Sequence, residues 1–357
     1  MTQAAPPRAG SPAGPVRLSI FSVQDHYPDR GRTLPQFYAE TIEQCVLADK
    51  LGYDSYFVAE HHFSHYGAVP NPAVMLSHLA ALTRSIRLGP AISVLTFHNP
   101  LDVAESYAML DILSGGRVTL GVGSGYLKHE FDGYGVDPAH KRERYDEAMA
   151  VLKKALTGER FSHEARYHAA KDVQICTRPV QPHGLPMYVA VSAPEVSYHV
   201  GRQGNNMIMV PYSQLERVAQ VGEVLANFRR GHEEHVAAGG DRSDGGDAMA
   251  AFHAHVAATD ADARVHAEPA FQLYLQTRLR AKHQTYEKVM SGGLALFGSV
   301  DTVVGKMLDL YNAGIRHFVL LKNFGNMPAA QVRRSMHLFA EEVLPRFNAA
   351  LGQRKVA

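Results

Sequence analysis

Three residues that could carry acid–base or metal chemistry stand together in the segment FVAEHHFSHYG, residues 57–67. Glu60, His61 and His62 follow an apolar run directly. An imidazole titrates near neutral pH, so one histidine could act as a general acid or base. Alternatively, neither takes part in chemistry, and one histidine is hydrogen-bonded in the wall while the other is solvated. Neighbouring residues of an extended chain point in opposite directions, so both could face one metal only across a turn.

A metal site is a second use for these side chains. His253 and His255 have the HxH spacing that metal sites use, and they could join His61 and His62 as ligands. The chain would then be a metal-dependent hydrolase. The residue types alone leave the acid–base and metal interpretations open.

The elements that position these residues follow a regular alternation of short apolar segments and helical patterns. Helix starts are marked by a Thr33–Gln36 capping box and by the pairs Asn71-Pro72 and Asn99-Pro100. Eight segments have the length and composition of buried strands: 16–23, 55–59, 86–95, 117–123, 187–192, 206–210, 251–258 and 317–321. Eight strand–helix units predict an α/β fold, the (β/α)8 TIM barrel, in preference to a doubly wound open sheet.

The domain organisation is expected to be simple. Residues 16–350 form one barrel domain, preceded by a disordered leader rich in Pro, Ala and Gly at residues 1–15. Two connections are longer than a minimal barrel needs: 159–186 before strand five and 267–301 between strands seven and eight. Long connections often form lids, so we expect 267–301 to cover the barrel mouth.

Composition excludes several classes of partner. The 36 Lys and Arg residues nearly balance the 35 Asp and Glu residues, and no block of like charge indicates nucleic acid or an anionic membrane. No run approaches the roughly 18 apolar residues of a membrane-spanning helix. Cys45 and Cys176 are far apart, which fits a reducing cytoplasm better than a disulfide framework.

Polar candidates gather where the predicted strands end, at the rim that holds active sites in TIM barrels. Glu60 and His61 follow strand two, and the glycine-rich GVGSGY, residues 121–126, follows strand four. GVGSGY lacks the GxGxxG dinucleotide fingerprint. Its glycines either let a flat ligand approach the backbone or form an ordinary turn.

The start of the fifth helix is a further candidate. Ser192 and Ser197 flank this helix N-terminus, where free N–H groups and the helix dipole favour a phosphate. Serines at such positions are also ordinary caps.

Several segments, taken together, resemble the bacterial luciferase-like flavin monooxygenases. The segments are AEHHFSHYGAVPNPAVMLSHLAALT, LTFHNPLDVAESYAMLDILSGGRVTLGVGSGYLKHEFDGYGVD and PMYVAVSAPEVSYHVGRQGN, continued by GSVDTVVGKMLDL and MHLFAEEVLPRF. The resemblance covers nearly the whole chain after the leader. It implies a (β/α)8 barrel with a flavin in its mouth, and commonly a dimer through helices of the N-terminal half.

The resemblance also implies roles for individual residues. His61 takes the place of the family's catalytic histidine, and Glu60, which precedes it, is a second catalytic candidate. Gly123 and Ser124 fall in the stretch that lies against the flavin ring system. The residues that fall where the family contacts the flavin phosphate are Ser192, Ala193 and Ser197.

This chain departs from the luciferases at four of these positions. Gly123 and Ser124 replace a reactive Cys and a phosphate-binding Arg, and Ser192 and Ala193 replace a Glu and a Ser. Light emission is therefore not expected. The phosphate must be held partly from elsewhere, by backbone N–H groups or Arg202. The weaker grip leaves room for a deazaflavin.

The expected activity is that of a monooxygenase that uses reduced FMN and O2 to oxygenate a small organic substrate, such as an aldehyde or ketone. No nicotinamide fingerprint is visible, so a separate flavin reductase would supply the reduced FMN. The alternatives are a deazaflavin-dependent hydride-transfer enzyme on the same barrel, the metal-dependent hydrolase, and a non-catalytic flavin-binding protein. Tyr66, Phe97 and Tyr126 are expected to line the pocket, which would suit an apolar or aromatic substrate, although core packing explains such residues equally well.

Overall fold

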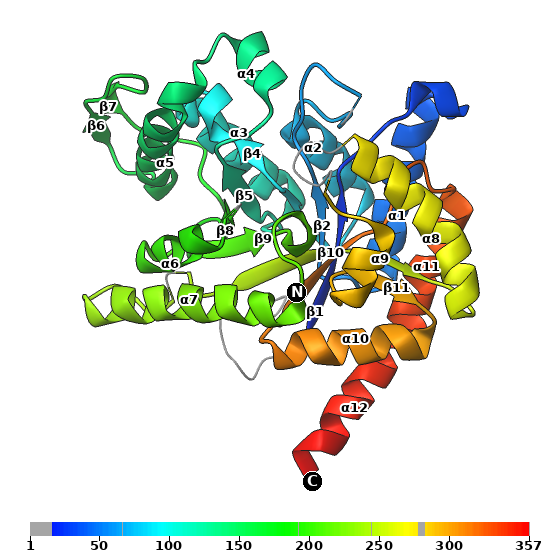
Figure 1. Ribbon diagram of the computed structural model, residues 1–357. Helices are drawn as coiled ribbons and strands as arrows, with labels where there is room; N and C mark the ends of the chain where they lie inside the picture. Colours follow the sequence, from blue (N-terminus) through cyan, green and yellow to red (C-terminus); the bar gives the residue numbers. More distant parts are fainter. Residues whose placement is uncertain (1–15, 66, 192, 244, 278–282, 357) are drawn as a thin grey trace.

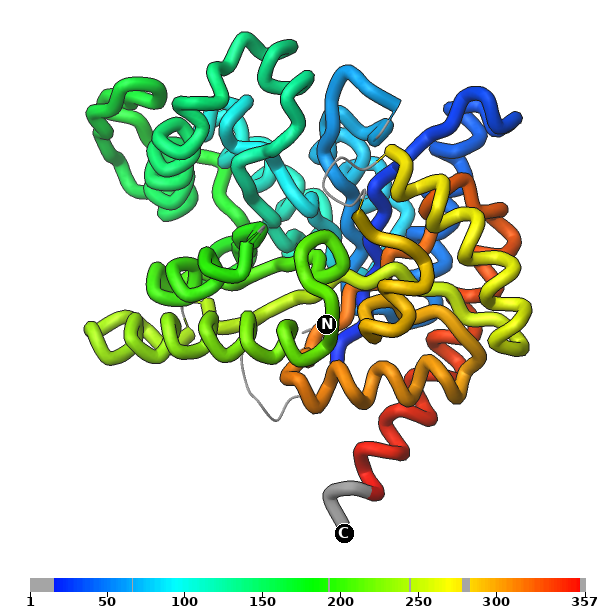
Figure 2. The backbone as a smooth tube through the Cα atoms, in the orientation of Figure 1, coloured from blue at the N-terminus to red at the C-terminus, as the bar shows by residue number. Residues whose placement is uncertain are grey.

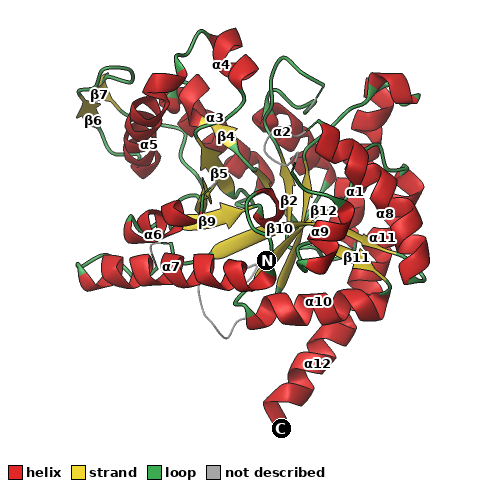
Figure 3. Ribbon diagram, viewed as in Figure 1, coloured by secondary structure: helices red, strands yellow, loops and turns green. Residues whose placement is uncertain are grey.

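A computed structural model describes residues 16–65, 67–191, 193–243, 245–277 and 283–356 of the chain. The predicted leader, Tyr66 and Ser192 lie outside the described residues. The strands form a central, mostly parallel sheet that is surrounded by helices (Figure 3). This is the predicted TIM barrel.

The barrel is built from strands at all eight predicted positions. They are β1 (Arg17–Ser22), β2 (Ser55–Val58), β3 (Arg87–Pro90) with β4 (Ser93–Val94), β5 (Leu120–Gly123), β8 (Met187–Val191), β9 (Asn206–Met209), β10 (Ala248–Val256) and β12 (His317–Leu321). Three further strands lie outside this set: β6 (Phe161–His163), β7 (Ala170–Val173) and β11 (Leu296–Gly298).

The third predicted strand is interrupted, and its two parts form the two ends of the sheet. The sheet runs in the order β3-β2-β1-β12-β10-β9-β8-β5-β4, so β3 and β4 form its two ends. They are consecutive in the chain, separated only by Ala91 and Ile92. A bridge between Leu88 and Val118 joins the same two sides. One interrupted strand therefore pairs with β2 on one side and with β5 on the other.

Helices cover the outside of the barrel (Figure 1). They are α1 (Leu34–Lys50), α2 (Pro72–Leu82), α3 (Pro100–Ser114), α4 (Lys128–Tyr134), α5 (Lys141–Thr157), α6 (Pro194–Arg202), α7 (Val218–Ala237), α8 (Asp260–Gln276), α9 (Tyr286–Ser291), α10 (Val300–Asn312), α11 (Ala329–Leu338) and α12 (Leu344–Val356). Short 3-10 turns are η1 (Pro28–Arg30), η2 (Leu95–Phe97), η3 (Pro138–His140) and η4 (Pro211–Ser213), and a π-helical turn, η6 (Phe339–Val343), precedes α12. The last helix leads the chain away from the body of the protein (Figure 2).

Local capping chemistry sets the helix starts that the sequence predicts. Thr33 and Gln36 form the predicted capping box of α1. The Asn71 and Asn99 side chains accept hydrogen bonds from the first turns of α2 and α3. No helix among the described residues has the length and apolar character needed to span a bilayer.

The two long connections contain regular structure. Residues 159–186 include the antiparallel hairpin β6–β7, beside α5. The 267–301 segment begins inside α8, whose start is set by the Thr259 side chain, and it also contains α9 and β11. Strand β11 pairs with the end of β10, so the last part of this segment extends the sheet.

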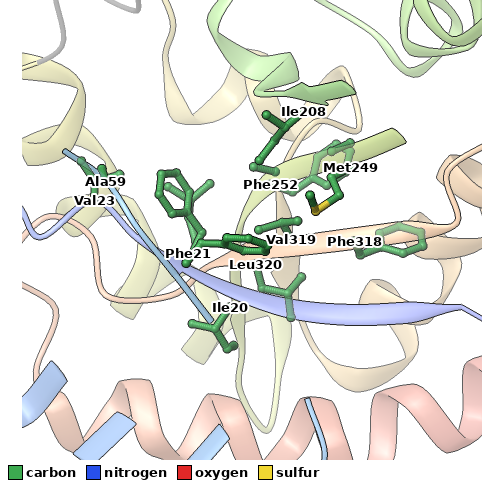
Figure 4. Packing of buried hydrophobic residues seen from close by; sticks show 14 of the residues in the cluster. Ile20, Phe21, Val23, Ala59, Ile208, Met249, Phe252, Phe318, Val319 and Leu320 are labelled. Carbon is green, nitrogen blue, oxygen red and sulfur yellow. The ribbon is translucent and has the colours of Figure 1, made fainter. Parts of the chain in front are cut away.

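The barrel interior and the strand–helix interfaces form one apolar core. Ile20, Phe21 and Val23 meet Ile208, Met249, Phe252 and the β12 residues 318–320 there (Figure 4). At the amino-terminal end of the barrel, polar groups replace this packing. Arg17 and Tyr188 bind the buried carboxylate of Asp247, and His317 Nε2 lies 2.6 Å from Ser19 Oγ. The opposite, carboxyl-terminal rim carries the predicted site.

Candidate functional site at the carboxyl rim of the barrel

His61 lies just past the end of β2, in the loop that the sequence places at the barrel mouth. Its side chain is 11% exposed. The edge of the Tyr126 ring approaches it at a centroid distance of 6.3 Å. Gly67 also packs closely against His61, since a Cβ there would lie 2.7 Å from His61 Cδ2. The imidazole therefore contacts its own loop and the turn after β5.

A buried carboxylate from α4 holds the first histidine pair in place. Glu130 Oε1 lies 3.0 Å from His61 Nδ1 and accepts the backbone N–H of His62 at 2.9 Å. The Glu130 side chain is 1% exposed. Sequence reasoning missed this residue, which follows the GVGSGY turn as HEF, because nothing in that short pattern indicates where the carboxylate points.

Glu60 faces away from His61 and joins two other histidines. Its Oε1 lies 3.0 Å from His62 Nε2 and 2.7 Å from His98 Nε2, and Oε2 accepts the N–H of Val94 at 3.2 Å. Burial alone would raise the pKa of Glu60, but hydrogen bonds from His62 and His98 hold that pKa below its usual value. An ionised carboxylate only accepts, so both Nε2 atoms carry the protons.

The second histidine is consequently fixed in one tautomer. With Nε2–H donating to Glu60, His62 Nδ1 is an acceptor, and the Tyr134 hydroxyl lies 3.1 Å away to donate to it. Burial lowers the pKa of His98, but the hydrogen bond and charge of Glu60 outweigh this and raise it. Glu60 and His62 thus brace the ends of β2 and η2 against α4.

The predicted four-histidine metal site is not formed. Strands β2 and β10 are separated by β1 and β12, which places them about 14 Å apart at the usual strand spacing. His253 packs edge-on against Phe271, Tyr274 and neighbouring rings, and His255 Nε2 lies 3.1 Å from His266 Nδ1. Among the described residues, the group with metal-ligand spacing is Glu60, His62 and His98, whose hydrogen bonds already account for that spacing.

Partly exposed apolar residues on the two sides of β5 form a surface that we call the apolar floor. Ala91 and Ile92 between β3 and β4, and Ala190 and Val191 at the end of β8, are partly exposed and pack on the core. The ends of β1, β2 and β12 are buried. A flat aromatic group fits such a surface of small apolar side chains, so the residues present are compatible with a flavin ring.

The predicted ring-contact residues border this floor. Gly123 is buried, and a Cβ there would lie 2.3 Å from Ile92 Cδ1, so this glycine permits close packing of β5 on the floor. Ser124 is partly exposed, and its carbonyl accepts a hydrogen bond from Thr96. Gly125 has φ +71°, which turns the chain toward Tyr126.

The predicted phosphate-binding residues are placed unequally. Ala193 precedes α6 and is partly exposed, without a side-chain cap. Ser197 is fully buried, and its hydroxyl donates to Pro194 O at 2.7 Å. Arg202 ends α6, far from that N-terminus, and pairs with Glu234. The suggestion that Arg202 holds the phosphate is therefore wrong.

A lysine that sequence reasoning passed over reaches the turn after β5. Lys141 begins α5, and its Nζ donates to Gly125 O at 3.0 Å. Val122 of β5 pairs with Val189 of β8. The two parallel strands therefore lead side by side to Gly125 and to the start of α6. This ammonium is thus a cation beside the strand ends that border the floor.

Tyr126 and Phe97, both predicted to line the pocket, lie in different surroundings. Tyr126 is 37% exposed and contacts His61, as a mouth residue should. Phe97 stacks on Tyr134 at 4.8 Å and meets Phe131 edge-on, inside an aromatic cluster between η2 and α4. Core packing is the better account of Phe97.

A cavity of about 410 Å³ lies among the loops at the carboxyl end of the barrel. Loops after β1, β2 and β5 and the end of α8 form its walls, and His61 itself is not among the lining residues. The lining is Asp25, His26, Tyr27, Pro28, Asp29, Arg30, Ser64, His65, Leu127, His129 and Thr277. Phe97 and Tyr126, expected to line the pocket, are not among these residues.

A parallel barrel with polar groups at its carboxyl rim is the architecture of many enzymes. The model of the luciferase-like monooxygenase family matches residues 16–317, so the chain belongs to that family. It is 36% identical over 205 residues to the uncharacterized protein y4wF of Sinorhizobium fredii, covering 57% of this chain and 60% of that protein. The match therefore spans less than two thirds of that relative.

Relatives of two cofactor types occur. The chain is 28% identical to 4-hydroxyprotoasukamycin monooxygenase of Streptomyces nodosus, over 87% of each protein. It is 36% identical to an F420-dependent glucose-6-phosphate dehydrogenase of Beutenbergia cavernae, over 47% of this chain and 52% of that one. Among solved structures, monooxygenase RslO1 of Streptomyces bottropensis has a TM-score of 0.81 at 26% identity, covering 93% of this chain and 99% of that chain.

Proposed function

We propose that this protein is a flavin-dependent monooxygenase that uses reduced FMN and O2 to oxygenate a small organic substrate. The observation that carries the proposal is the position of His61, at the barrel rim beside an accessible apolar floor. Family membership supplies the cofactor class, and the full-length relatives favour monooxygenation. The F420-dependent glucose-6-phosphate dehydrogenases match about half of the chain. An F420-dependent secondary alcohol dehydrogenase of known structure covers 94% of the chain at 19% identity, a likeness that shows the fold alone.

The cofactor would lie on the floor formed by Ala91, Ile92, Ala190 and Val191, with Gly123 and Ser124 along its border. When bound, reduced flavin supplies the electrons that activate dioxygen. Its phosphate would lie toward Ser192, Ala193 and Lys141, a setting in which an ammonium group and backbone N–H groups suit an anion. The buried Ser197 hydroxyl would stabilise the first turn of α6 through its hydrogen bond to Pro194 O.

His61 would hold and move the proton between the substrate and the reacting centre. Its ring contacts Tyr126 and Gly67. Glu60 is buried and bonded to His62 and His98, so we assign it a positioning role in place of the catalytic role expected for it. Helices α8 and α9, described parts of the connection expected to form a lid, would limit the access of water to the mouth.

Two partners accompany this proposal. Trigonelline monooxygenase of Acinetobacter baylyi, 28% identical over 198 residues, is described as an oxygenase component, which supports a separate flavin reductase here. A second copy of the chain would cover the apolar face of α2 and α3, where Val74, Met109 and Leu113 are exposed. The cytoplasmic location stays a prediction.

The deciding experiment compares two reduced cofactors anaerobically, by titrating the protein with reduced FMN and with reduced F420. Tighter binding of FMN, followed by substrate-dependent oxygen uptake with a panel of carbonyl compounds, is the expected result. Preferential F420 binding with turnover in the absence of oxygen would establish the hydride-transfer alternative. Binding of FMN without turnover of any substrate would leave a flavin-binding protein.

A further inference from the structure

Glu130 occupies an unusual place for a carboxylate. It lies in the first turn of the short helix α4, yet its side chain turns inward and is almost fully buried. A buried carboxylate is costly unless donors satisfy it. Here a single oxygen, Oε1, meets both His61 Nδ1 and the backbone N–H of His62.

These two contacts define the chemistry available to His61. A carboxylate accepts hydrogen bonds, so the nitrogen facing it, Nδ1, carries a proton. Nε2 is then the nitrogen that can accept or release a proton elsewhere. The contact to the His62 backbone holds the turn on which His61 sits, so ring and backbone are fixed by the same group.

We propose that Glu130 is the positioning residue of this site: it fixes the tautomer of His61 and stabilises its protonated form. The proposal rests on the proposed function only in giving His61 a proton-transfer task. A carboxylate behind an imidazole recurs in enzymes whose histidine must present one chosen nitrogen.

Among the described residues, Glu130 is a charged group in direct contact with the His61 ring. Glu130 faces it from α4, and Tyr126 faces it from the turn after β5. Glu60, the other carboxylate nearby, is engaged by His62 and His98. His129 lies close by, with Nε2 3.1 Å from His62 O.

The test is a nitrogen-15 NMR titration of the histidines in the free protein, with the His61 signal assigned by its loss in His61→Gln. In the unsubstituted protein, neutral His61 should carry its proton on Nδ1. Glu130→Gln removes the charge and keeps the shape, and should lower the pKa of His61 by about one unit, a tenfold change in protonation equilibrium. In Glu130→Ala, neutral His61 should also be a mixture of the Nδ1–H and Nε2–H tautomers.

Glu147→Gln is the matched control. Glu147 also accepts backbone N–H groups, from Arg166, Tyr167 and His168, but it lies on α5 beside the β6–β7 hairpin. It should leave the His61 titration unchanged. An unchanged His61 pKa and tautomer in Glu130→Gln and Glu130→Ala would overturn the proposal and leave Glu130 as a support of the turn.

Kinetics distinguish this role from simple structural support. In Glu130→Gln, turnover should fall about tenfold or more and its pH profile should shift with the His61 pKa, while the Kd for reduced FMN stays within twofold. A loss of FMN binding with an unmoved pH profile would contradict positioning. The NMR result needs neither flavin nor substrate, so a failure of the proposed function is seen separately.

Discussion

Nε2 of His98 lies 2.7 Å from Oε1 of Glu60, which joins the residue just after η2 to the loop that follows β2. The same oxygen also receives His62, so removing this carboxylate leaves two histidines and the Val94 N–H without their acceptor. Glu60→Ala should therefore lower the free energy of unfolding by about 3 kcal/mol or more. Urea unfolding measures this.

The control for Glu60 is Asp132→Ala. Asp132 pairs with Lys128 on the exposed face of α4, where an ion pair contributes little. Equal losses in the two variants would mean that the buried brace is no stronger than a surface pair.

Replacing His61 tests the proton-transfer proposal directly. His61→Ala should reduce turnover by about 10² to 10⁴, because a positioned acid or base contributes that much, while reduced FMN still binds. Stopped-flow kinetics and a flavin titration measure the two effects. His337→Ala, an exposed histidine on α11, serves as the control. A rate unchanged in His61→Ala removes this residue from the mechanism.

Lys141 should matter for the affinity of the cofactor. Lys141→Ala removes the ammonium beside the turn after β5 and should weaken binding of reduced FMN about tenfold, the size of one charge-assisted contact. Lys128→Ala, on the exposed side of α4, should leave binding unchanged. Riboflavin, which lacks the phosphate, should bind both variants alike. A similar loss for riboflavin would show that Lys141 acts on the protein fold.

The amino-terminal end of the barrel should make the fold sensitive to acid. Burial, followed by the charge of Arg17, lowers the pKa of His317 to about 4. The unfolded chain binds this proton near pH 6.5, and the folded chain binds it only near pH 4. Stability should therefore fall as pH drops between these values, by about 3 kcal/mol in total.

Urea midpoints measured between pH 7.5 and 4 follow this loss. His317→Gln cannot take up the proton and should show a flatter pH dependence over the same range. Parallel curves for the two proteins would mean that other groups cause the acid sensitivity.

The apolar face of α2 and α3 predicts the oligomeric state. Leu113→Glu puts a charge at a residue that is 61% exposed, where a second copy would cover it, and should convert dimers to monomers. Light scattering after gel filtration reads the mass. Val265→Glu, at an even more exposed position on α8, is the control. A monomeric unsubstituted protein would contradict the proposed dimer.

The fold was predictable because its signals are local. Thr33, Asn71 and Asn99 mark helix starts through contacts within three residues, and apolar segments mark the strands. The interruption between β3 and β4 was not predictable, since it depends on pairing with two different neighbours. The start of α8 at Asp260 was missed because the insertion was assigned by length, and its cap, Thr259, was overlooked.

The candidate site was only partly predictable, because most of its contacts join residues that are far apart in the sequence. His61 could be placed because it follows a strand end. Glu130 is 69 residues further along, and its contact with His61 exists only once α4 folds over the rim. His98 and Lys141 likewise reach the site through tertiary packing. Side-chain direction on a short helix leaves no periodic pattern in the sequence.

Ala91 and Ile92 have two structural roles in this protein. They interrupt the strand that joins the two ends of the sheet, and they form part of the surface proposed for the flavin. A substitution there that reshapes the cofactor surface also disturbs the seam of the cylinder. Cofactor preference in this chain is therefore easier to alter at the loops around the mouth than at the strands beneath it.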